Sequence, residues 1–322
     1  MEIIAGEQVG DRDDHLVNSI KSMLQTVPPL PSEPCIYRVP YVHRRVNEEA
    51  YTPVIVSIGP LHHGKQTLQE MEVHKQRYLN DFLKRRPDIG LKNYVRILRD
   101  IEERARNCYA ECIMLGSDDF IQIMLLDGCF IIELFLKCMY TQFRNKNDPI
   151  FMASVIRFEV RRDMLLLENQ LPFFVLECLF DLNVEAGLHM GLSFDKIALH
   201  FIGSFVGSLQ LRRSSYQVKH FVDLYIQCHA LPEARMLPRG GTAIRSIPSA
   251  TKLHDAGVEF KKSMTSKHFM DVKFSNQGFL EMPSFVVGDT AESFLRNLIA
   301  FEQCDNSNTR YISEYIVLLS NG

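Results

Sequence analysis

The sequence predicts a mainly α-helical fold, in which a single helical domain carries a short extended segment and a small C-terminal β-hairpin. Over several long segments, apolar residues recur every three or four positions, which is the spacing of one face of an α-helix. β-branched runs bounded by turn residues are confined to residues 54–58 and to the neighbourhood of 269–287. No repeat of solenoid length is present, so the helices have to pack into one ordinary core.

The composition of the 322 residues is that of a folded, soluble protein. Apolar residues make up 46% and charged residues 23%, and 17 glycines with 14 prolines are too few for a collagen-like, low-complexity or disordered chain. The formal net charge is −3. Because binding to nucleic acid or to an anionic membrane surface is favoured by a basic excess that this chain lacks, we expect no nucleic-acid partner.

Residues 1–34 are predicted to form a flexible polar leader with one short helix around residues 16–24. The leader ends at Val27, Pro28 and Pro29, which disfavour a continuing helix. Its first 15 residues carry acids where a signal peptide has basic residues, and they lack a long apolar run. None of the eight cysteines belongs to a Cys-x-x-Cys motif, and we interpret them as reduced, buried thiols. We therefore expect a cytoplasmic protein.

Residues 35–322 are predicted to form the single helical domain. Its extended run, 54–58, is stopped by a Gly-Pro pair, and it delivers the chain to a turn. Amphipathic helices then follow over 66–86 and 94–112, where apolar side chains share one face and charged side chains lie between them.

The most apolar segment, residues 120–140, is preceded by Ser117 and two acids that suit a helix N-terminus. A membrane span has to be considered for a stretch of this length. Asp127 and Glu133 each oppose insertion by about 3 kcal/mol at the centre of a bilayer, which cancels the gain from the apolar residues. We therefore predict a buried helix at the centre of a protein core.

The second half of the domain is predicted to contain two helical pieces over 151–180, joined by a break at Pro172, because proline excludes the preceding residue from helical geometry. Further helices are predicted over 194–211 and 291–302, the latter as the last element. A long loop over 231–250 separates this helical body from a hairpin-plus-helix region, whose hairpin turns at a Ser-Asn-Gln-Gly sequence.

A glycine-rich turn before the first long helix resembles a phosphate-binding loop in its spacing. Gly59, Gly64 and Lys65 match the G-x-x-x-x-G-K pattern, which places backbone N–H groups and a lysine around phosphates. Gln66 stands where the magnesium-binding hydroxyl residue belongs, and the candidate acid, Asp127, lies in a segment predicted to be helical. A tight turn with a solvated lysine is our main interpretation, with nucleotide binding as the alternative.

Two adjacent histidines are the other candidates for chemistry, because a neutral imidazole can act as a general base or bind a metal near pH 7. His62 and His63, together with Glu168, would be the catalytic residues of an enzyme. The other acids in apolar surroundings are Asp127, Glu133 and Asp163. The alternative, which we favour, is that the histidines serve the fold and that the acids meet arginines or backbone donors in the core.

No metal and no cofactor are predicted. Cys108 and Cys112, or His63 and His74, could each form half of a metal site, but no second pair is spaced to complete one. Cysteines four positions apart on an apolar helix face are typical of packing residues.

Four regions of the chain together resemble the plant family called domain of unknown function 247. They are AYTP with SIGPLHHGK and HKQRYLNDFL, then RRDMLLLENQLPFFVLECLF, then IPSATKLHDAGVEFKK, and finally AESFLRNLIAFEQC. The resemblance runs from about Cys35 to the end of the chain. It implies a plant protein with a largely helical fold, no established reaction and, in typical members, a C-terminal apolar segment that anchors the protein to a membrane.

The resemblance also implies a class of function. Some members are linked to pollen–stigma self-incompatibility in grasses, which implies recognition or signalling. This chain ends at Gly322, before the usual anchor, so we expect a cytoplasmic protein, with the cytoplasmic side of a membrane as the alternative location. The leading hypothesis is a non-enzymatic module for protein–protein interaction or signalling. An enzyme that uses His62 and His63 is the first alternative, and a nucleotide-binding protein is the second.

Overall fold

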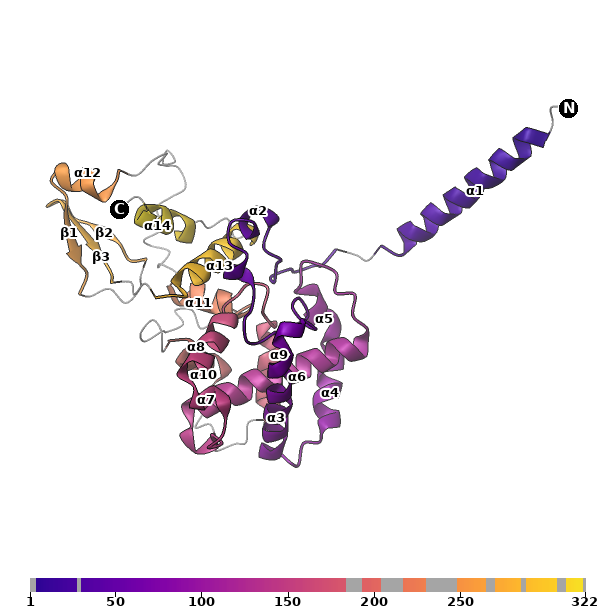
Figure 1. The fold of residues 1–322 in the computed structure, drawn as a ribbon, viewed down its shortest axis with the longest axis horizontal. Coiled ribbons are helices and arrows are strands. Elements are labelled where there is room, and N and C mark those ends of the chain that lie inside the picture. Colours follow the sequence, from indigo (N-terminus) through magenta and orange to yellow (C-terminus); the bar gives the residue numbers. More distant parts are fainter. Residues whose placement is uncertain are drawn as a thin grey trace.

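The computed structural model describes residues 4–27, 30–183, 193–203, 217–229, 248–264, 270–284, 288–305 and 311–320. Within these ranges the protein is mainly α-helical with one small sheet, as predicted (Figure 1). The α-helices are α1 (Ile4–Gln25), α2 (Tyr41–Arg44), α3 (Gln69–Arg85), α4 (Leu91–Asp100), α5 (Glu102–Asn107), α6 (Ser117–Met139), α7 (Pro149–Met152), α8 (Ser154–Asp163), α9 (Phe173–Asn183), α10 (Phe194–Gly203), α11 (Phe221–His229), α12 (Ala250–Asp255), α13 (Ala291–Cys304) and α14 (Tyr311–Ser320). Short 3₁₀ turns are η1 (Glu49–Tyr51), η2 (Gln66–Leu68) and η3 (Thr141–Phe143).

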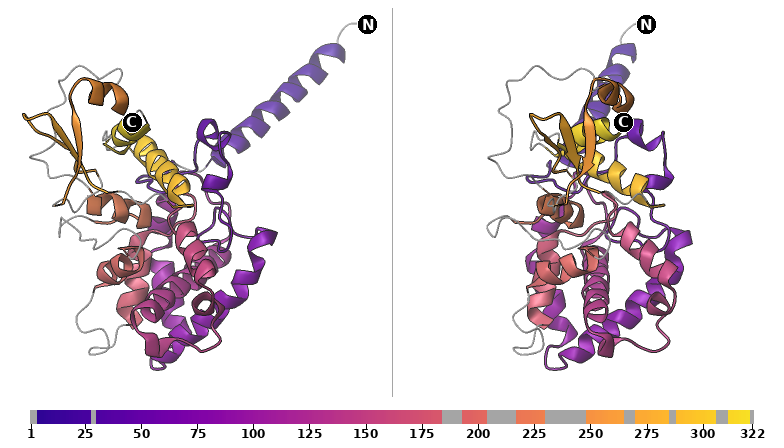
Figure 2. Two further views of the ribbon diagram at one scale, coloured as in Figure 1. Left: turned by 60° about the vertical axis from the view of Figure 1, so that its left-hand side comes forward. Right: turned by 90° about the vertical axis from the view of Figure 1, so that its left-hand side faces the viewer.

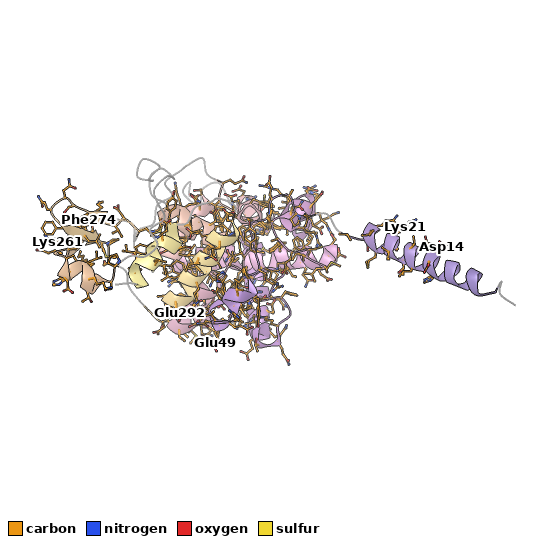
Figure 3. All side chains as sticks on the ribbon, turned by 90° about the horizontal axis from the view of Figure 1, so that it is seen from above. Asp14, Lys21, Glu49, Lys261, Phe274 and Glu292 are labelled. Atoms are coloured by element: carbon orange, nitrogen blue, oxygen red, sulfur yellow. The ribbon has the colours of Figure 1, made fainter. Side chains whose placement is uncertain are left out.

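The N-terminal helix α1 projects from the rest of the molecule (Figure 1). It is longer than the short helix predicted around residues 16–24, because it begins at Ile4. All described side chains over 13–27 are exposed, so α1 packs against no part of the body through these residues. Figure 3 shows Asp14 and Lys21 at one end of the molecule and the small sheet at the other.

The core is built around α6, which packs against α3, α4, α9 and α10. Most side chains of α6 are buried, and Phe135 of this helix contacts the rings of Phe194, Phe201 and Phe221. The helices predicted over 66–86 and 120–140 are therefore confirmed as α3 with η2 and as α6. Among the residues that the structure describes, no helix is long and apolar enough to cross a membrane.

The helix predicted over 94–112 is wrong as one element, because the chain forms two helices with a junction at Ile101. The φ and ψ angles of Ile101 are −109° and 4°, outside the helical range, so the regular helix is interrupted there. Arg106 then donates to the carbonyl groups of Ile113 and Leu115, which draws the following chain back along α5. Cys112 lies in that returning chain and is exposed, whereas the shared apolar face predicted it to be buried.

Two helical pieces joined by a break are confirmed as α8 and α9, but the break is longer than predicted, because α8 ends at Asp163 and Pro172 directly precedes α9. The helix predicted over 194–211 is observed as α10, and its part beyond Gly203 lies outside the described residues. Most of the loop predicted over 231–250 also lies outside them, and the chain is described again just before α12.

The sheet contains β1 (Glu259–Lys262), β2 (Lys273–Phe274) and β3 (Phe279–Met282) in the order β1-β3-β2. β2 and β3 are antiparallel and form the predicted hairpin, which turns at Gly278 with a φ of 81°. β1 pairs in parallel with β3 and has no counterpart among the sequence predictions. In Figures 1 and 2, the sheet and α12 lie at the edge of the molecule, away from α6.

The helix predicted over 291–302 is confirmed as α13, but it is not the last element, because α14 follows it. Glu302 joins the two helices. Its carboxylate accepts hydrogen bonds from the backbone N–H groups of Ile312 and Ser313 at 2.8 Å each, in the first turn of α14. An acid at this position satisfies helix N-terminal donors that have no partner within the helix.

Candidate functional site

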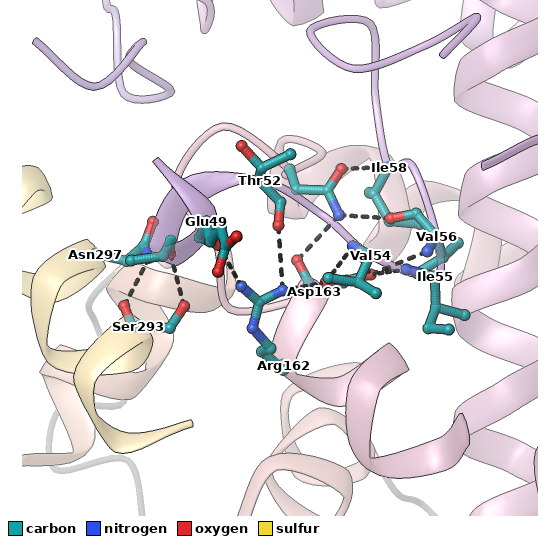
Figure 4. Close-up of polar contacts among 12 residues, drawn as sticks. Glu49, Thr52, Val54, Ile55, Val56, Ile58, Arg162, Asp163, Ser293 and Asn297 are labelled. Atoms are coloured by element: carbon teal, nitrogen blue, oxygen red, sulfur yellow. Dashed lines mark hydrogen bonds and ion pairs between the residues drawn. The ribbon is translucent and has the colours of Figure 1, made fainter. Parts of the chain in front are cut away.

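The segment 54–59 is extended and irregular, and side chains from elsewhere in the chain bind its backbone (Figure 4). Asp163, at the end of α8, accepts hydrogen bonds from the N–H groups of Val54, Ile55 and Val56 at 2.7 to 3.1 Å. The predicted strand or extended segment is therefore an extended segment. A carboxylate takes the place that a neighbouring strand would have, because its two oxygens accept several donors at once.

Asn169 and Gln170, in the break between α8 and α9, complete this arrangement. Asn169 Oδ1 accepts from the N–H of Ile58 at 2.7 Å, and its amide group donates to the carbonyl oxygens of Val56 and Asp163. Gln170 Nε2 donates to two carbonyl groups freed at the end of α8, and its Oε1 accepts from the N–H of Phe221. Asn169 and Gln170 thus satisfy backbone groups after the end of α8, in the segment 54–59 and at the start of α11.

Gly59 ends the segment under a steric constraint. Its φ is +72°, and a Cβ atom on it would lie 2.5 Å from the carbonyl oxygen of Gln170. Its N–H donates to Asp127 Oδ2 at 2.8 Å, and Asp127 Oδ1 lies 2.6 Å from Nζ of Lys75. Lys75 also donates to the carbonyl oxygen of Ser57. We call the segment 54–59 with Asp127, Asp163, Asn169 and Gln170 the clamp.

Helix α13 binds the chain just before the clamp. Ser293 and Asn297 both donate to the carbonyl oxygen of Ala50, at 2.6 and 2.8 Å (Figure 4). Asn297 Oδ1 also accepts from the N–H of Leu167. Arg162 donates to the carbonyl groups at Glu49 and Thr52. Three of the regions that carry the family resemblance therefore meet at this point of the molecule.

His62 and Glu168 form a buried pair beside the clamp. His62 Nε2 lies 3.3 Å from Glu168 Oε2, and neither ring nitrogen has a better aligned partner among the described residues. Glu168 also accepts from Arg44 at 2.6 Å and from the N–H of Val39 at 2.7 Å, and Arg38 lies 3.6 Å away. The exposed fraction of His62 is 2%, so a substrate has no access to the ring in this conformation.

The electrostatics of this pair follow from burial and from its partners. Burial lowers the pKa of His62, and Glu168 offsets this only in part. Burial alone would raise the pKa of Glu168, but the contact with His62 and the hydrogen bonds from Arg44 and Val39 outweigh it and lower that pKa. A neutral imidazole therefore lies beside an ionised carboxylate, an arrangement that orients a general base when the imidazole can reach a substrate.

The candidate residues that follow the buried His62 in the glycine-rich turn lie at the surface and do not form a site together with it. His63, Gly64 and Lys65 are exposed, and no heavy atom lies within 4 Å of a Cβ built on Gly64. The N–H groups of His63 and Lys65 donate to the carbonyl groups of Pro60 and His62, within the same turn. A phosphate cradle would direct such N–H groups outward. Asp127, its candidate acid, lies inside α6 rather than at the end of a strand.

Each of the four acids predicted in apolar surroundings has a polar partner. Glu133 accepts from Arg85 at 2.6 and 2.7 Å, and Asp127, Asp163 and Glu168 have the partners given above. Burial raises the pKa of Asp127 and Glu133, and it raises the pKa of Asp163 to about 6, against the opposing effect of the backbone N–H groups. Among the described ranges, no three His, Cys, Asp or Glu side chains are arranged to hold a metal ion.

Sequence reasoning missed Lys75 and Asn297, although a signal for both was present. Lys75 lies on the buried stripe of α3 with Met71, Tyr78 and Phe82, so it is a charged residue at an apolar position. Asn297 lies on the buried face of α13 in the same way. A polar residue at a buried helical position needs a partner, but the periodicity does not say which one.

Known proteins are similar to this chain over the regions just described. The family model described as a plant protein of unknown function, DUF247, matches residues 36–321. The UPF0481 protein At3g47200 of Arabidopsis thaliana is 31% identical over 313 residues, which cover 88% of this chain and 64% of that protein. A second UPF0481 protein of Arabidopsis thaliana, At3g02645, is 33% identical over 151 residues, which cover 47% of this chain and 28% of that protein.

The chain thus spans less than two thirds of the length of these relatives. No solved structure matches it. The match over residues 36–321 covers the helical body, the sheet and the clamp together. The chain therefore belongs to the DUF247 family of plant proteins of unknown function.

Proposed function

We propose that the chain is a non-enzymatic protein-interaction module whose binding element is helix α1. The observation that carries this proposal is the apolar face that α1 exposes to solvent. Its members are Leu16, Val17, Ile20, Met23 and Leu24. They recur at helical spacing and are 44% to 64% exposed, whereas a surface helix ordinarily buries such a face against its own domain.

The charge of α1 favours a protein, rather than a lipid surface, as the partner that covers its apolar face. The helix carries four acidic and two basic residues, so its net charge is −2. Helices that lie on anionic membranes are rich in lysine and arginine on the polar face. A partner protein with an apolar groove binds a helix of this kind through residues at i, i+4 and i+7, here Leu16, Ile20 and Met23.

The body serves as the rigid support of this helix. Its chemically suggestive side chains are bound to backbone groups or to each other, as in the clamp and the His62–Glu168 pair. An active site instead requires groups that reach a substrate. The setting that we propose is recognition or signalling in the plant cytoplasm or at the cytoplasmic side of a membrane, self-incompatibility-type recognition included, and this setting rests on the resemblance alone.

The test is proximity labelling in plant cells with three versions of the chain, each fused to the labelling enzyme at the C-terminus. The first is the unaltered chain. The second carries Leu16→Glu, Ile20→Glu and Met23→Glu, and the third carries the matched control set Asn18→Glu, Ser22→Glu and Gln25→Glu on the opposite face of α1. We expect a set of labelled proteins that the first and third versions share and the second loses.

Identical labelling by all three versions would contradict the proposal. A concentration-dependent dimer of the unaltered chain in light scattering, abolished only in the second version, would identify a second copy of this chain as the occupant instead. Circular dichroism of the three versions checks that the body is folded in each.

The enzymatic alternative has one observation in its favour, which is the neutral imidazole of His62 beside the ionised Glu168. If this pair is catalytic, the chain has to open, since His62 is buried. A screen of plant metabolites for turnover, with His62→Gln as the comparison, tests this alternative. A turnover that disappears in His62→Gln at unchanged stability would favour an enzyme.

A further inference from the structure

Cys35 and Cys108 lie side by side where the chain that follows α1 joins the body. Ile36 and Tyr109 form an isolated parallel β-bridge at this place. The N–H groups of Cys35 and Ile36 both donate to the carbonyl oxygen of Cys108 at 2.8 Å, and the N–H of Ala110 donates to Ile36 at 2.9 Å. Two segments far apart in the sequence are thus held in one register.

Cys35 and Cys108 are the residues that directly precede the bridged pair, so they form the neighbouring pair of the same register. Cys108 is the C-cap of α5, with φ and ψ angles of −74° and −21°, and its carbonyl oxygen accepts from the N–H of Cys35 at 2.8 Å, so the two backbones are in direct contact. Disulfides join residues whose Cα atoms are about 4.4 to 6.8 Å apart. We propose that Cys35 and Cys108 are a thiol pair that a peroxide oxidises to a reversible disulfide.

The surroundings give the two thiols different roles. The Cys35 thiol is buried, and its interaction with the Cys108 thiol raises the pKa of Cys35 and lowers the pKa of Cys108. Arg104 lowers the pKa of Cys108 further, and Glu33 opposes this. Cys108 is partly exposed, and as a neutral thiol it donates to the carbonyl of Arg104 at 3.5 Å. A thiolate within reach of solvent is the reactive species, so Cys108 is the attacking group.

The oxidation proceeds in two balanced steps. The Cys108 thiolate attacks hydrogen peroxide, the O–O bond breaks, and a sulfenic acid forms while the departing hydroxide takes up a proton and becomes water. The Cys35 thiolate, formed as its proton leaves, attacks the sulfur of the sulfenic acid. The S–O bond breaks, a second water leaves, and the S–S bond forms. Two thiols and one peroxide give one disulfide and two water molecules, and a dithiol reductant reverses the change.

The disulfide would add a covalent link between the start of the body, which follows α1 in the sequence, and the C-terminal end of α5. Cys35 is already held from a second side, since its carbonyl oxygen lies 2.9 Å from Nε2 of the buried His220. The backbone at Cys35 is therefore fixed by Cys108 on one side and by His220 on the other. This inference does not depend on the function of α1, because it concerns only the chemistry of the pair.

The test uses the full chain, reduced and then exposed to hydrogen peroxide. We expect an intact mass that falls by two hydrogen atoms, a peptide digest in which Cys35 and Cys108 are linked, and recovery of the starting mass with dithiothreitol. The control variant Cys112→Ser removes an exposed cysteine close by and should form the same disulfide. A linkage of Cys108 to Cys112, or no linkage at all, would overturn the proposal.

Two replacements of Cys35 separate its roles. In both Cys35→Ser and Cys35→Ala the sulfenic acid of Cys108 has no resolving thiol, so dimedone should trap it. Serine retains a hydrogen-bond donor toward Cys108 and alanine does not, so alkylation of Cys108 by iodoacetamide at pH 7 should be roughly tenfold slower in Cys35→Ala than in Cys35→Ser. Equal alkylation rates, or a Cys108 that reacts no faster than Cys112 in the unaltered chain, would contradict the assignment of Cys108 as the attacking thiolate.

Discussion

The clamp and the helix α1 differ in how their backbone donors are hydrogen-bonded and in whether their apolar side chains are buried. The segment 54–59 in the clamp has no regular secondary structure, yet the N–H groups of Val54, Ile55, Val56, Ile58 and Gly59 all donate to buried side chains. Helix α1 satisfies its backbone internally and exposes an apolar face. The irregular segment therefore has its backbone donors satisfied by the core, whereas the described side chains of the regular helix, from residue 13 on, are all exposed.

The largest effect should come from removal of the carboxylate at the centre of the clamp. Asp163→Ala leaves three N–H groups without an acceptor, and each costs about 1 to 3 kcal/mol when buried. We expect the free energy of unfolding to fall by at least about 3 kcal/mol in denaturant titrations. Asp163→Asn, which keeps one acceptor oxygen, should lose less and remains measurable if the alanine variant fails to fold. The control Asp14→Ala in α1 should change stability by less than about 0.5 kcal/mol.

Two glycines of the same turn give a matched comparison inside and outside the clamp. Gly59→Ala combines a positive φ with a Cβ only 2.5 Å from the carbonyl oxygen of Gln170, so it should destabilise by about 3 kcal/mol. Gly64→Ala has a φ of +80° but open space around it and should cost about 1 kcal/mol. Equal losses for the two variants would show that the close approach to Gln170 is not a constraint.

Replacement of the two adjacent histidines should affect stability differently, because one is buried and the other is exposed. His62→Ala removes a buried ring and leaves a cavity beside Glu168, so we expect a loss of about 2 kcal/mol. His63→Ala, at an exposed position, should lie within about 0.5 kcal/mol of the unaltered chain. Thermal or chemical unfolding of both variants measures this. An unchanged stability of His62→Ala would remove the structural role that we assign to this ring.

The smallest effect is a pH dependence that comes from Asp163. Its pKa is about 6 in the folded protein, against a reference value of 3.8, so the folded state binds the proton more tightly than the unfolded state. Stability therefore falls as the pH rises through this range, by roughly 1 kcal/mol between pH 5 and pH 7 for this group alone. The same titration of Asp163→Asn should lack this contribution. A variant whose pH profile parallels that of the unaltered chain would contradict the raised pKa.

The sequence predicts the helices α3, α6 and α13 and the β2–β3 hairpin well. Their signals are local, since each apolar face and each turn residue lies within a few positions of its neighbours. The junction at Ile101 and the strand β1 have no such signal. All four residues of β1 are exposed, so no alternation of apolar and polar residues marks the strand, and only its pairing with β3 defines it.

In the candidate site, too, local sequence signals mark residues, but they do not predict which distant residues these contact. Glu168 stands out in the sequence as an acid in apolar surroundings, His62 as one of two adjacent histidines, and Gly59 by the spacing of the glycine-rich turn. All three lie at or beside the clamp. Their partners could not be predicted. Val56 and Asp163 are 107 positions apart, and Glu168 meets Val39 across 129 positions, so only the packing of α8 and α9 against the N-terminal half brings them together.

The sequence by itself determined that the chain is mainly helical, that the helix around Asp127 and Glu133 is a buried one, and that the chain resembles one plant family. These properties depend on periodicity, composition and order along the chain. Only the tertiary structure decided which donors meet Asp163, that Cys35 lies beside Cys108, and that α1 stands alone. A buried polar group requires a partner, but many partners satisfy that requirement equally well, and the choice among them belongs to the packing of the whole core.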